Sequence, residues 1–421
     1  MIKKLQVVHL NASSSGGAFV AAQRLSDALN QCDGIVSSHL IFEGAPGPYT
    51  LWAKHWLLKK FAFLLHAIEK LDFLRYEKSK SIRFAFSHAL TGVNILKHPL
   101  VKNADVIHLH WVNKGFLSFN SMEQIIHSGK KIVWTCHDVW PFTGGCYHPR
   151  GCENFFEGCG NCQYLKSPSQ NDLSSVVFKQ KQDLWGRGQI QFITPSNWLK
   201  QTAEKSALMQ HHSKITNIPN CVDVEFFRAS TEVEKNQSRE NFGLNPTLNT
   251  LLFSAANLKN AAKGIHEFLQ VCHLLVQQNI EFQILIIGDQ RDMDIQFPVK
   301  TVFLGFVNDA EILRSAYWSA TTYVTTSHEE NLPTTIMESL SCGVPVCAFG
   351  VGGIPEMIVQ HKTGMFSPKL DVRTMANQIV ELFDLINHSG SEVRNQCVQF
   401  ATENYSDAVI SQRHLSVYRS I

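Results

Sequence analysis

Two glutamates stand on either side of a predicted helix start in the stretch TTSHEENLPTTIMESLSCGVPV, residues 325–346. Glu330 follows a β-rich run, and Pro333 suits an early helical position because that position needs no N–H partner. Gly343 is a natural helix terminator, so Glu338 lies more than one turn inside an apolar helix. The helix dipole accounts for an acid at Glu330 better than for one at Glu338. The pair is therefore a candidate for ligand binding.

Two loops have residues suited to a phosphate. The strand LQVVHL runs into a small-residue loop with Gly16 and Gly17, and the helix behind it would point free N–H groups at a ligand. SSSGG is not the dinucleotide-binding fingerprint, so a purely structural turn is the alternative. In SAANLKNAAKGIHEFL, a strand ends at Asn257 and Lys263 opens a helix, where a lysine can neutralise a leaving diphosphate. The alternative is a solvated lysine, and Lys259 is a competitor.

Four cysteines, Cys146, Cys152, Cys159 and Cys162, lie within seventeen residues in GGCYHPRGCENFFEGCGNCQYL. Four thiolates can enclose a tetrahedral zinc ion, and the final C-x-x-C is a common half-site, although the first pair is more widely spaced than usual. Buried or idle thiols and an iron–sulfur cluster are the alternatives. The chain has 11 cysteines, an odd count, and no export signal, which favours reduced thiols over disulfides.

Predicted strands and helices alternate along the chain in two successive series, and they position these residues. Short apolar runs such as VIHLHWV and FQILIIGD alternate with helical patterns, which indicates two doubly wound parallel α/β sheets. A length of 421 residues also suggests two domains. We expect an N-terminal domain over 1–195 with a cysteine-rich loop at 146–162, a second domain over 196–403, and a closing helix over 404–421. The polar stretch STEVEKNQSRENFGLNPTLN is expected to be a surface connection, and ligands should collect where the strands end.

The composition excludes several classes of partner. A net charge of +2 gives no electrostatic case for nucleic acid. The start MIKKLQVVHLNASS lacks the features of a signal peptide, so we expect a cytoplasmic chain. No apolar run reaches the ~18 residues of a membrane span. The aromatic and basic stretch 51–87 is typical of helices on an anionic membrane surface, and an amphipathic helix packed on its own domain is the alternative.

The run SHEENLPTTIMESLSCGVPVCAFGVGGIPEMI resembles the signature of retaining, nucleotide-sugar-dependent glycosyltransferases of family 4. Seven residues separate Glu330 from Glu338, as they separate the paired glutamates of that family. The resemblance extends over HDVW at His137, ITPSNWLK, IPNCVDVEFF and LGFVNDAEILRSAYWSA. The run HDVWPFTGGC is similar to the cysteine-rich loop of bacterial surface-polysaccharide glycosyltransferases. The resemblance implies the GT-B fold, in which two Rossmann-like domains face each other across a cleft.

The resemblance also implies roles for single residues. Glu338 would accept hydrogen bonds from the ribose and Glu330 from the donor sugar, while His137, oriented by Asp138, would lie near the reacting groups. Asn257 departs from the arginine that the family commonly has there, and Glu329 has no assigned role. The implied catalytic residues are His137, Asp138, Lys263 and Glu330; the implied donor-binding residues are Gly16, Gly17, Asn257, Lys263, Gly305, Phe306, Val307, Glu330, Asn331, Leu332, Pro333, Thr334 and Glu338.

The expected reaction is transfer of a sugar from a nucleotide-diphosphate sugar to a glycan or lipid-linked acceptor in surface-polysaccharide synthesis. Catalysis should need no metal, because Lys263, the helix N-termini and the glycine loop can stabilise the departing phosphates. The D-x-D triplet at 292–294 is interpreted as solvated carboxylates. The alternatives are a sugar-nucleotide epimerase and a non-catalytic sugar-nucleotide-binding protein. A dinucleotide oxidoreductase is disfavoured because its glycine fingerprint is missing.

Overall fold

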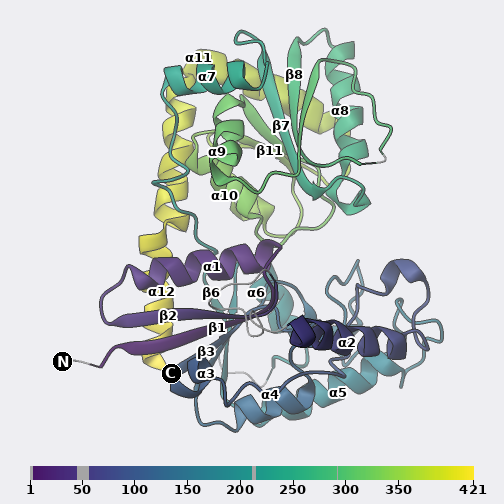
Figure 1. The fold of residues 1–421 in the computed structure, drawn as a ribbon. Helices are drawn as coiled ribbons and strands as arrows, with labels where there is room; N and C mark the ends of the chain where they lie inside the picture. The colour runs from purple at the N-terminus through teal and green to yellow at the C-terminus, as the bar shows by residue number, and fades with distance from the viewer. Residues whose placement is uncertain (1–2, 45–55, 211–214, 292) are drawn as a thin grey trace. The chain divides into compact units, whose positions relative to one another are not determined.

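The chain divides into two compact units, Met1–Pro219 with Ile410–Ile421, and Asn220–Val409 (Figure 1). The computed structural model describes residues 3–44, 56–210, 215–291 and 293–421. The first unit extends beyond the expected boundary at 195 because β6 (Thr216–Asn217) pairs with β5 (Ile190–Thr194) and so continues the first sheet. A strand of two residues has too little pattern to be found in the sequence.

The first unit is built on a parallel six-stranded sheet with the order β2-β1-β3-β4-β5-β6. Its inner strands are short and mostly apolar. Every side chain of β3 is buried, as expected for a sheet covered on both faces. The other strands are β1 (Leu5–Ser13), β2 (Ile35–Glu43), β3 (Val106–Leu109) and β4 (Lys131–Thr135). The helices are α1 (Gly17–Asn30), α2 (Trp56–Phe73), α3 (Pro99–Asn103), α4 (Phe119–Ile126), α5 (Leu173–Gly186) and α6 (Asn197–Lys205).

The second unit repeats this architecture with the strand order β12-β11-β10-β7-β8-β9, again all parallel. Helices flank the sheet, and their apolar faces complete one core with it. The strands are β7 (Asn249–Asn257), β8 (Phe282–Asp289), β9 (Thr301–Gly305), β10 (Thr322–Thr325), β11 (Val346–Phe349) and β12 (Gly364–Ser367). The helices are α7 (Glu232–Asn241), α8 (Ile265–Gln277), α9 (Ala310–Ser319), α10 (Thr334–Ser341) and α11 (Val372–Tyr405), which is kinked at Ser389.

The end of the chain returns to the first unit. Helix α12 (Asp407–Ser420) contributes its residues from Ile410 onward to that unit. The Tyr418 hydroxyl lies 2.7 Å from Nδ1 of His108 on β3, and both side chains are fully buried. The closing helix is therefore packed into the first unit through a polar contact in its interior.

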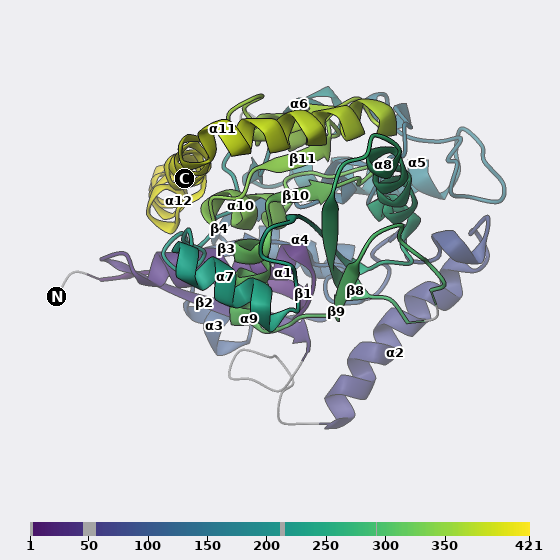
Figure 2. The same ribbon diagram turned by 90° about the horizontal axis from the view of Figure 1, so that it is seen from above.

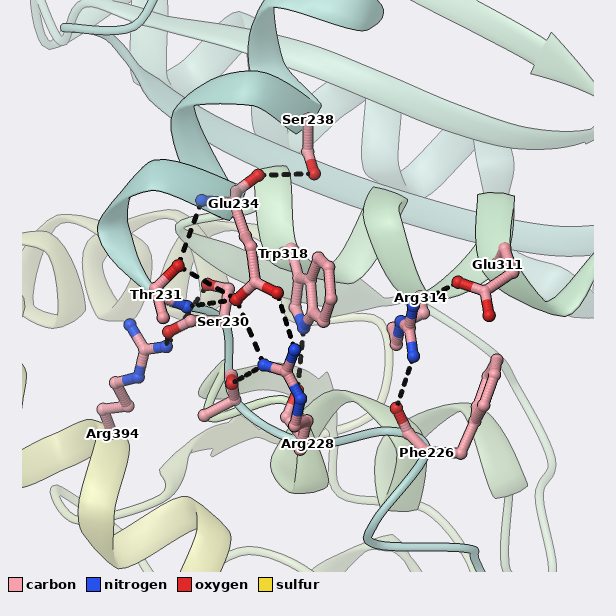
Figure 3. Close-up of polar contacts among 11 residues, drawn as sticks. Phe226, Arg228, Ser230, Thr231, Glu234, Ser238, Glu311, Arg314, Trp318 and Arg394 are labelled. Carbon is pink, nitrogen blue, oxygen red and sulfur yellow. Dashed lines mark hydrogen bonds and ion pairs between the residues drawn. The ribbon is translucent and has the colours of Figure 1, made fainter.

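The polar stretch expected to be a connection is largely the helix α7. Thr231 and Glu234 form a capping box at its start, and the Arg228 guanidinium binds the Glu234 carboxylate through contacts of 2.6 and 3.1 Å (Figure 3). The hydrogen bonds from Arg228 lower the pKa of Glu234 to about 2. Trp318 Nε1 donates to the Arg228 carbonyl at 2.7 Å. This hydrogen bond holds the segment before α7 against α9. The stretch lies at the surface as expected, but part of it is helical because caps and ion pairs stabilise a helix that has no apolar stripe.

Candidate functional site

Two charges predicted from the sequence meet at the carboxyl edge of the second sheet. Lys263 follows β7 and Glu330 follows β10, and Lys263 Nζ lies 2.5 Å from Glu330 Oε1. The Lys263 side chain is 37% exposed and that of Glu330 is 16% exposed. Because β7 and β10 are adjacent parallel strands, both loops leave the same edge of the sheet. The pair is partly open to solvent, so a ligand can reach the lysine.

Gly264 allows these two loops to come into contact. Its φ is +75°, and a Cβ at this position would lie 2.0 Å from the Thr326 carbonyl oxygen. The Thr326 hydroxyl donates to the Gly264 carbonyl at 2.6 Å, and the His328 N–H donates to the Ala262 carbonyl at 2.8 Å. A side chain at position 264 would force the loops apart. The glycine therefore has a structural role in bringing Lys263 to Glu330.

A third loop, after β11, supports the backbone of Glu330. Gly352 has a φ of +56°, and a Cβ there would lie 1.7 Å from the Glu330 carbonyl oxygen. The Gly353 N–H donates to that same oxygen at 3.4 Å. The GVGGIP segment thus acts on the first glutamate through the main chain. This segment belongs to the run that resembles the family signature, but none of its residues was predicted to lie in the site.

Glu338 lies in the interior of the second unit. It is on α10, only 3% exposed, and the Tyr317 hydroxyl donates to its Oε2 at 2.8 Å. Burial, followed by the charge of Glu338, raises the pKa of Tyr317 well above its ordinary value. Tyr317 was missed in the sequence, where it is one aromatic residue among many. The Tyr317 hydroxyl thus holds the Glu338 carboxylate in place.

The segment between the two glutamates joins the loop to α10. Asn331 and Thr334 are half-buried, Leu332 is buried in the core, and Pro333 occupies the N-cap position. In the described structure the N-cap residue, Pro333, makes no side-chain hydrogen bond to the first N–H groups of α10, and such groups can donate to an anion. Leu332 can contribute only its main chain to a ligand. The binding of phosphate by the backbone groups of this segment stays a prediction.

An open pocket of about 570 Å³ lies at the ends of β7, β8 and β9. Phe306 is 57% exposed beside it, and Val307 is half-buried. Arg291 binds Asp289 at 2.5 Å, and this hydrogen bond lowers the pKa of Asp289 to about 2. The pocket is lined by Ala256, Asp289, Gln290, Arg291, Gly305 and Phe306.

Asp289 and Arg291 were missed in the sequence, although Asp289 ends the strand LIIGD. In the sheet Asp289 is paired with Asn257, whose side chain accepts from the Lys259 N–H at 2.9 Å. Arg291 therefore binds the carboxylate of the strand partner of Asn257, the position where the family commonly has an arginine. Asp292, the first acid of the D-x-D triplet, lies outside the described residues.

The predicted residues of the first unit lie at the carboxyl ends of its own strands. Gly16, with a φ of +89°, precedes α1, which begins at Gly17 and has no side-chain cap. Both glycines are exposed. The free start of α1 therefore has the geometry expected of an anion-binding loop.

His137 and Asp138 follow β4 and have different neighbours. His137 Nε2 lies 2.9 Å from Nδ1 of His110, and burial lowers the pKa of His137 to about 4. Asp138 accepts hydrogen bonds from Trp111 Nε1 at 3.1 Å and from the Trp140 N–H at 2.8 Å, and burial raises its pKa to about 6. The His137 ring stacks on that of His110, which was not among the residues predicted from the sequence.

The four predicted cysteines line one small cavity of about 20 Å³. That volume is sufficient for one ion or water molecule. Cys159 has a φ of +59° in the turn CGNC, and its Sγ accepts a hydrogen bond from the Gly144 N–H at 3.1 Å. Burial raises the pKa of Cys159 to about 12 and that of Cys162 to about 11, whereas a bound cation would favour the thiolates. Four thiols have the number and chemistry that zinc prefers, but they are not among the described groups whose ligand atoms lie within 4.8 Å of one another, so an ion here would require the side chains to move closer together.

Figure 2 shows the course of α2, and several apolar side chains of this helix are exposed on one face. Its side chains recur at helical spacing, while the opposite face, with Ala62, Glu69 and Phe73, is buried. Residues 51–55 of the aromatic and basic stretch lie outside the described residues. Among the residues that the structure describes, none of the helices combines the length and apolar character needed to cross a bilayer. The exposed apolar residues of this region are Phe61, Phe63, Leu64, Ile68, Leu71, Leu74 and Phe84.

Comparison with known proteins relates the second unit to glycosyltransferases. Residues 249–384 match the family model described as Glycosyl transferases group 1. The putative colanic acid biosynthesis glycosyl transferase WcaC of Escherichia coli is 26% identical over 59% of this chain and 60% of its own length. N-acetyl-alpha-D-glucosaminyl L-malate synthase of Bacillus anthracis is 22% identical over 76% of this chain and 74% of its own length. The match to WcaC thus spans less than two thirds of that relative.

Solved structures resemble the whole chain. HepE of Anabaena, in complex with UDP, aligns over 99% of this chain and 100% of its own with a TM-score of 0.63 and 15% identity. Sucrose-phosphate synthase of Thermosynechococcus elongatus aligns over 99% and 98% with a TM-score of 0.63 and 16% identity. These likenesses and the two parallel sheets confirm the predicted class of fold, with two doubly wound Rossmann-like domains.

Proposed function

We propose that this protein is a retaining glycosyltransferase that moves a sugar from a nucleotide-diphosphate sugar to a glycan or lipid-linked oligosaccharide. The observation that supports this most strongly is the contact of Lys263 with Glu330 at the uncapped start of α10, where anion-binding and hydroxyl-binding groups meet. The family match covers this region, and WcaC is named for colanic acid biosynthesis, which favours a role in surface-polysaccharide synthesis.

The proposed mechanism assigns each group to a part of the donor. The first N–H groups of α10 and Lys263 bind the diphosphate and stabilise the negative charge that grows as it leaves. The Glu330 carboxylate then accepts hydrogen bonds from sugar hydroxyls, and Glu338, already held by Tyr317, accepts from the ribose. The pocket beside Phe306 receives the base. No metal ion is needed in this scheme, because preorganised donors surround the departing phosphates.

The test is a panel of nucleotide sugars, first for binding and then for transfer to lipid-linked acceptors. We expect one donor to bind, and transfer to preserve the anomeric configuration seen by NMR of the product. Added magnesium or manganese should leave the rate unchanged. Conversion of the donor in the absence of any acceptor would indicate an epimerase instead. Tight donor binding with no turnover across the acceptor panel would indicate a non-catalytic binding protein.

We propose a structural zinc ion for the cysteine cluster. The four thiols line one cavity, and the N–H···S contact from Gly144 to Cys159 is of the kind that orients a ligating sulfur. X-ray absorption at the zinc edge should show sulfur ligands at about 2.3 Å. Cys162→Ser should remove this sulfur shell, whereas Cys272→Ser, a buried cysteine of the second unit, should leave it intact. Wild-type protein without zinc–sulfur ligation would exclude the assignment.

We propose that α2 holds the first unit against the cytoplasmic face of the membrane. Phe63 is 67% exposed and Leu71 is 64% exposed, and Lys78 and Arg75 lie nearby in the sequence. Such a surface combines apolar insertion with attraction to anionic lipid. Phe63→Ser with Leu71→Ser should abolish flotation with anionic vesicles. Val233→Ser, which removes another exposed apolar side chain, is the matched control. Equal flotation of all three proteins would refute the proposed surface.

A further inference from the structure

Three histidines gather in the interior of the first unit, apart from the residues proposed to bind the donor. His9 lies on β1, His108 lies on β3, and His110 follows β3 by one residue. His9 and His108 are directly paired in the register of these adjacent strands. All three side chains are buried. Parallel pairing therefore brings together imidazoles that are about a hundred residues apart in the sequence.

The rings are close enough to share one ligand. The ring centroid of His9 lies 4.9 Å from that of His108 and 5.1 Å from that of His110, and the remaining pair is 4.3 Å apart. His9 Nδ1 and His110 Nε2 are separated by 2.9 Å. One nitrogen from each histidine lies within 4.8 Å of the other two. A tetrahedral zinc ion, bonded to nitrogens at about 2.0–2.1 Å, would hold them about 3.3 Å apart.

His9 has a polar atom that the protein leaves unsatisfied. Its side chain is 0% exposed, and in the part of the chain that the structure describes its Nε2 is buried with no hydrogen-bond partner. Buried ring nitrogens are ordinarily paired with protein, water or a metal ion. The second nitrogen of His9 is directed at another imidazole. The unpaired nitrogen is therefore evidence for a bound group that does not depend on the ring distances.

We propose that His9, His108 and His110 bind a divalent transition-metal ion, with zinc as the ion best matched to three imidazoles. Three neutral nitrogen ligands suit a borderline metal better than magnesium or calcium, which prefer oxygen. Binding through His9 Nε2 would give that nitrogen a partner, and His110 Nε2 would exchange its contact with His9 for a metal–nitrogen bond. The site would be separate from the cysteine cluster and would need no residue of the second unit.

The surrounding groups can hold the ligands in position. His110 Nδ1 lies 2.9 Å from His137 Nε2, and so its other nitrogen can face the metal. The two nitrogens of His108 contact the Tyr418 hydroxyl at 2.7 Å and the Thr135 hydroxyl at 2.8 Å. Whichever nitrogen binds the ion, the other keeps a hydroxyl partner, as is usual for ligating histidines. Binding through Nε2 would displace the Thr135 hydroxyl and keep the contact with Tyr418 on α12.

Two further histidines lie beside the cluster and are left out of the ligand set. His39 Nδ1 contacts Gln23 Oε1 at 3.2 Å, and its ring centroid is 6.2 Å from that of His9. His414 Nδ1 contacts the Ile410 carbonyl at 3.0 Å within α12, and its centroid is 5.8 Å from that of His108. His414 is therefore a buried neighbour with a local partner, and it provides a matched control.

The test uses the full-length chain without a histidine tag. The protein is stripped with a chelator, reloaded with zinc and studied by metal analysis and zinc-edge X-ray absorption. We expect a nitrogen shell at about 2.0–2.1 Å, which distinguishes this ion from one held by cysteine sulfur at about 2.3 Å. His9→Gln and His110→Gln should each lose the nitrogen shell and one zinc per chain. His414→Gln should retain both.

Two outcomes would overturn the proposal. The first is wild-type protein whose zinc shows no imidazole ligation after reloading. The second is a nitrogen shell that persists unchanged in folded His9→Gln and His110→Gln proteins, with folding verified by circular dichroism. If neither variant folds, the wild-type spectrum decides alone, because imidazole scattering is either present or absent. Neither outcome depends on donor binding or transfer, so the proposed function is tested separately.

Discussion

At the scale of single residues, Lys263 is the group whose removal should act on transfer more than on binding. Its Nζ contacts Glu330, and in the proposed reaction it meets charge that grows only as the diphosphate departs. Loss of one such donor typically costs about 10²–10³ in kcat. We expect Lys263→Ala to fall in this range with a small change in donor affinity. Steady-state transfer kinetics are the measurement, and Lys259→Ala is the matched control. If transfer is slow in Lys259→Ala and normal in Lys263→Ala, the role belongs to Lys259 and the assignment to Lys263 is wrong.

Asp138 provides a residue-scale prediction on pH. Burial raises its pKa to about 6, although Trp140, His148 and Lys181 act in the opposite direction. The folded protein therefore holds a proton that the unfolded chain, with an ordinary value near 3.8, releases. This contribution to stability is complete below pH ~4 and is lost as the pH rises through ~6, by up to about 3 kcal/mol.

Asp138→Asn removes this titration. The variant lacks the acceptor for Trp111, which adds a constant cost, but its free energy of unfolding relative to wild type should rise between pH 4 and pH 7. Urea unfolding at both pH values measures the difference. A difference that does not change with pH would show that the carboxyl is solvated in the folded protein.

At the scale of elements, the loop after β11 is expected to control the position of Glu330. In Gly352→Ala, the added Cβ would meet the Glu330 carbonyl oxygen at 1.7 Å and would have a positive φ. Gly243→Ala has the same left-handed strain, with a φ of +65°, but meets nothing within 4 Å among the described residues. Such strain alone costs about 1–2 kcal/mol. We expect Gly352→Ala to be less stable than Gly243→Ala and to bind donor at least about tenfold more weakly. Equal stability and unchanged affinity in calorimetry would contradict this role.

The elements also show which parts of the fold could be read from the sequence. Buried strands such as β3 and β8 are mostly apolar, so the two parallel sheets were predictable. Helix α7 was missed because its stability comes from the Thr231–Glu234 cap and the Arg228 ion pair rather than from an apolar face. Glu330 was predicted from its spacing to Glu338, and Lys263 from its place between a strand end and a helix start. Gly352, Arg291 and His110 were not, because their contacts depend on which strands become neighbours.

At the scale of the whole molecule, donor binding should stabilise the second unit more than the first. The proposed donor contacts in the second unit are carried by the loops after β7, β10 and β11, which already share hydrogen bonds through Gly264 and Glu330. A ligand at a hundred times its Kd should stabilise the unit that binds it by about 2.7 kcal/mol. We expect hydrogen exchange of the full chain with a nucleotide sugar to slow most at 257–264, 326–334 and 350–353. The strands of the first sheet should change less, because their protection depends on their own core. Protection concentrated in β1 and β3 instead would mean that the nucleotide binds chiefly to the first unit.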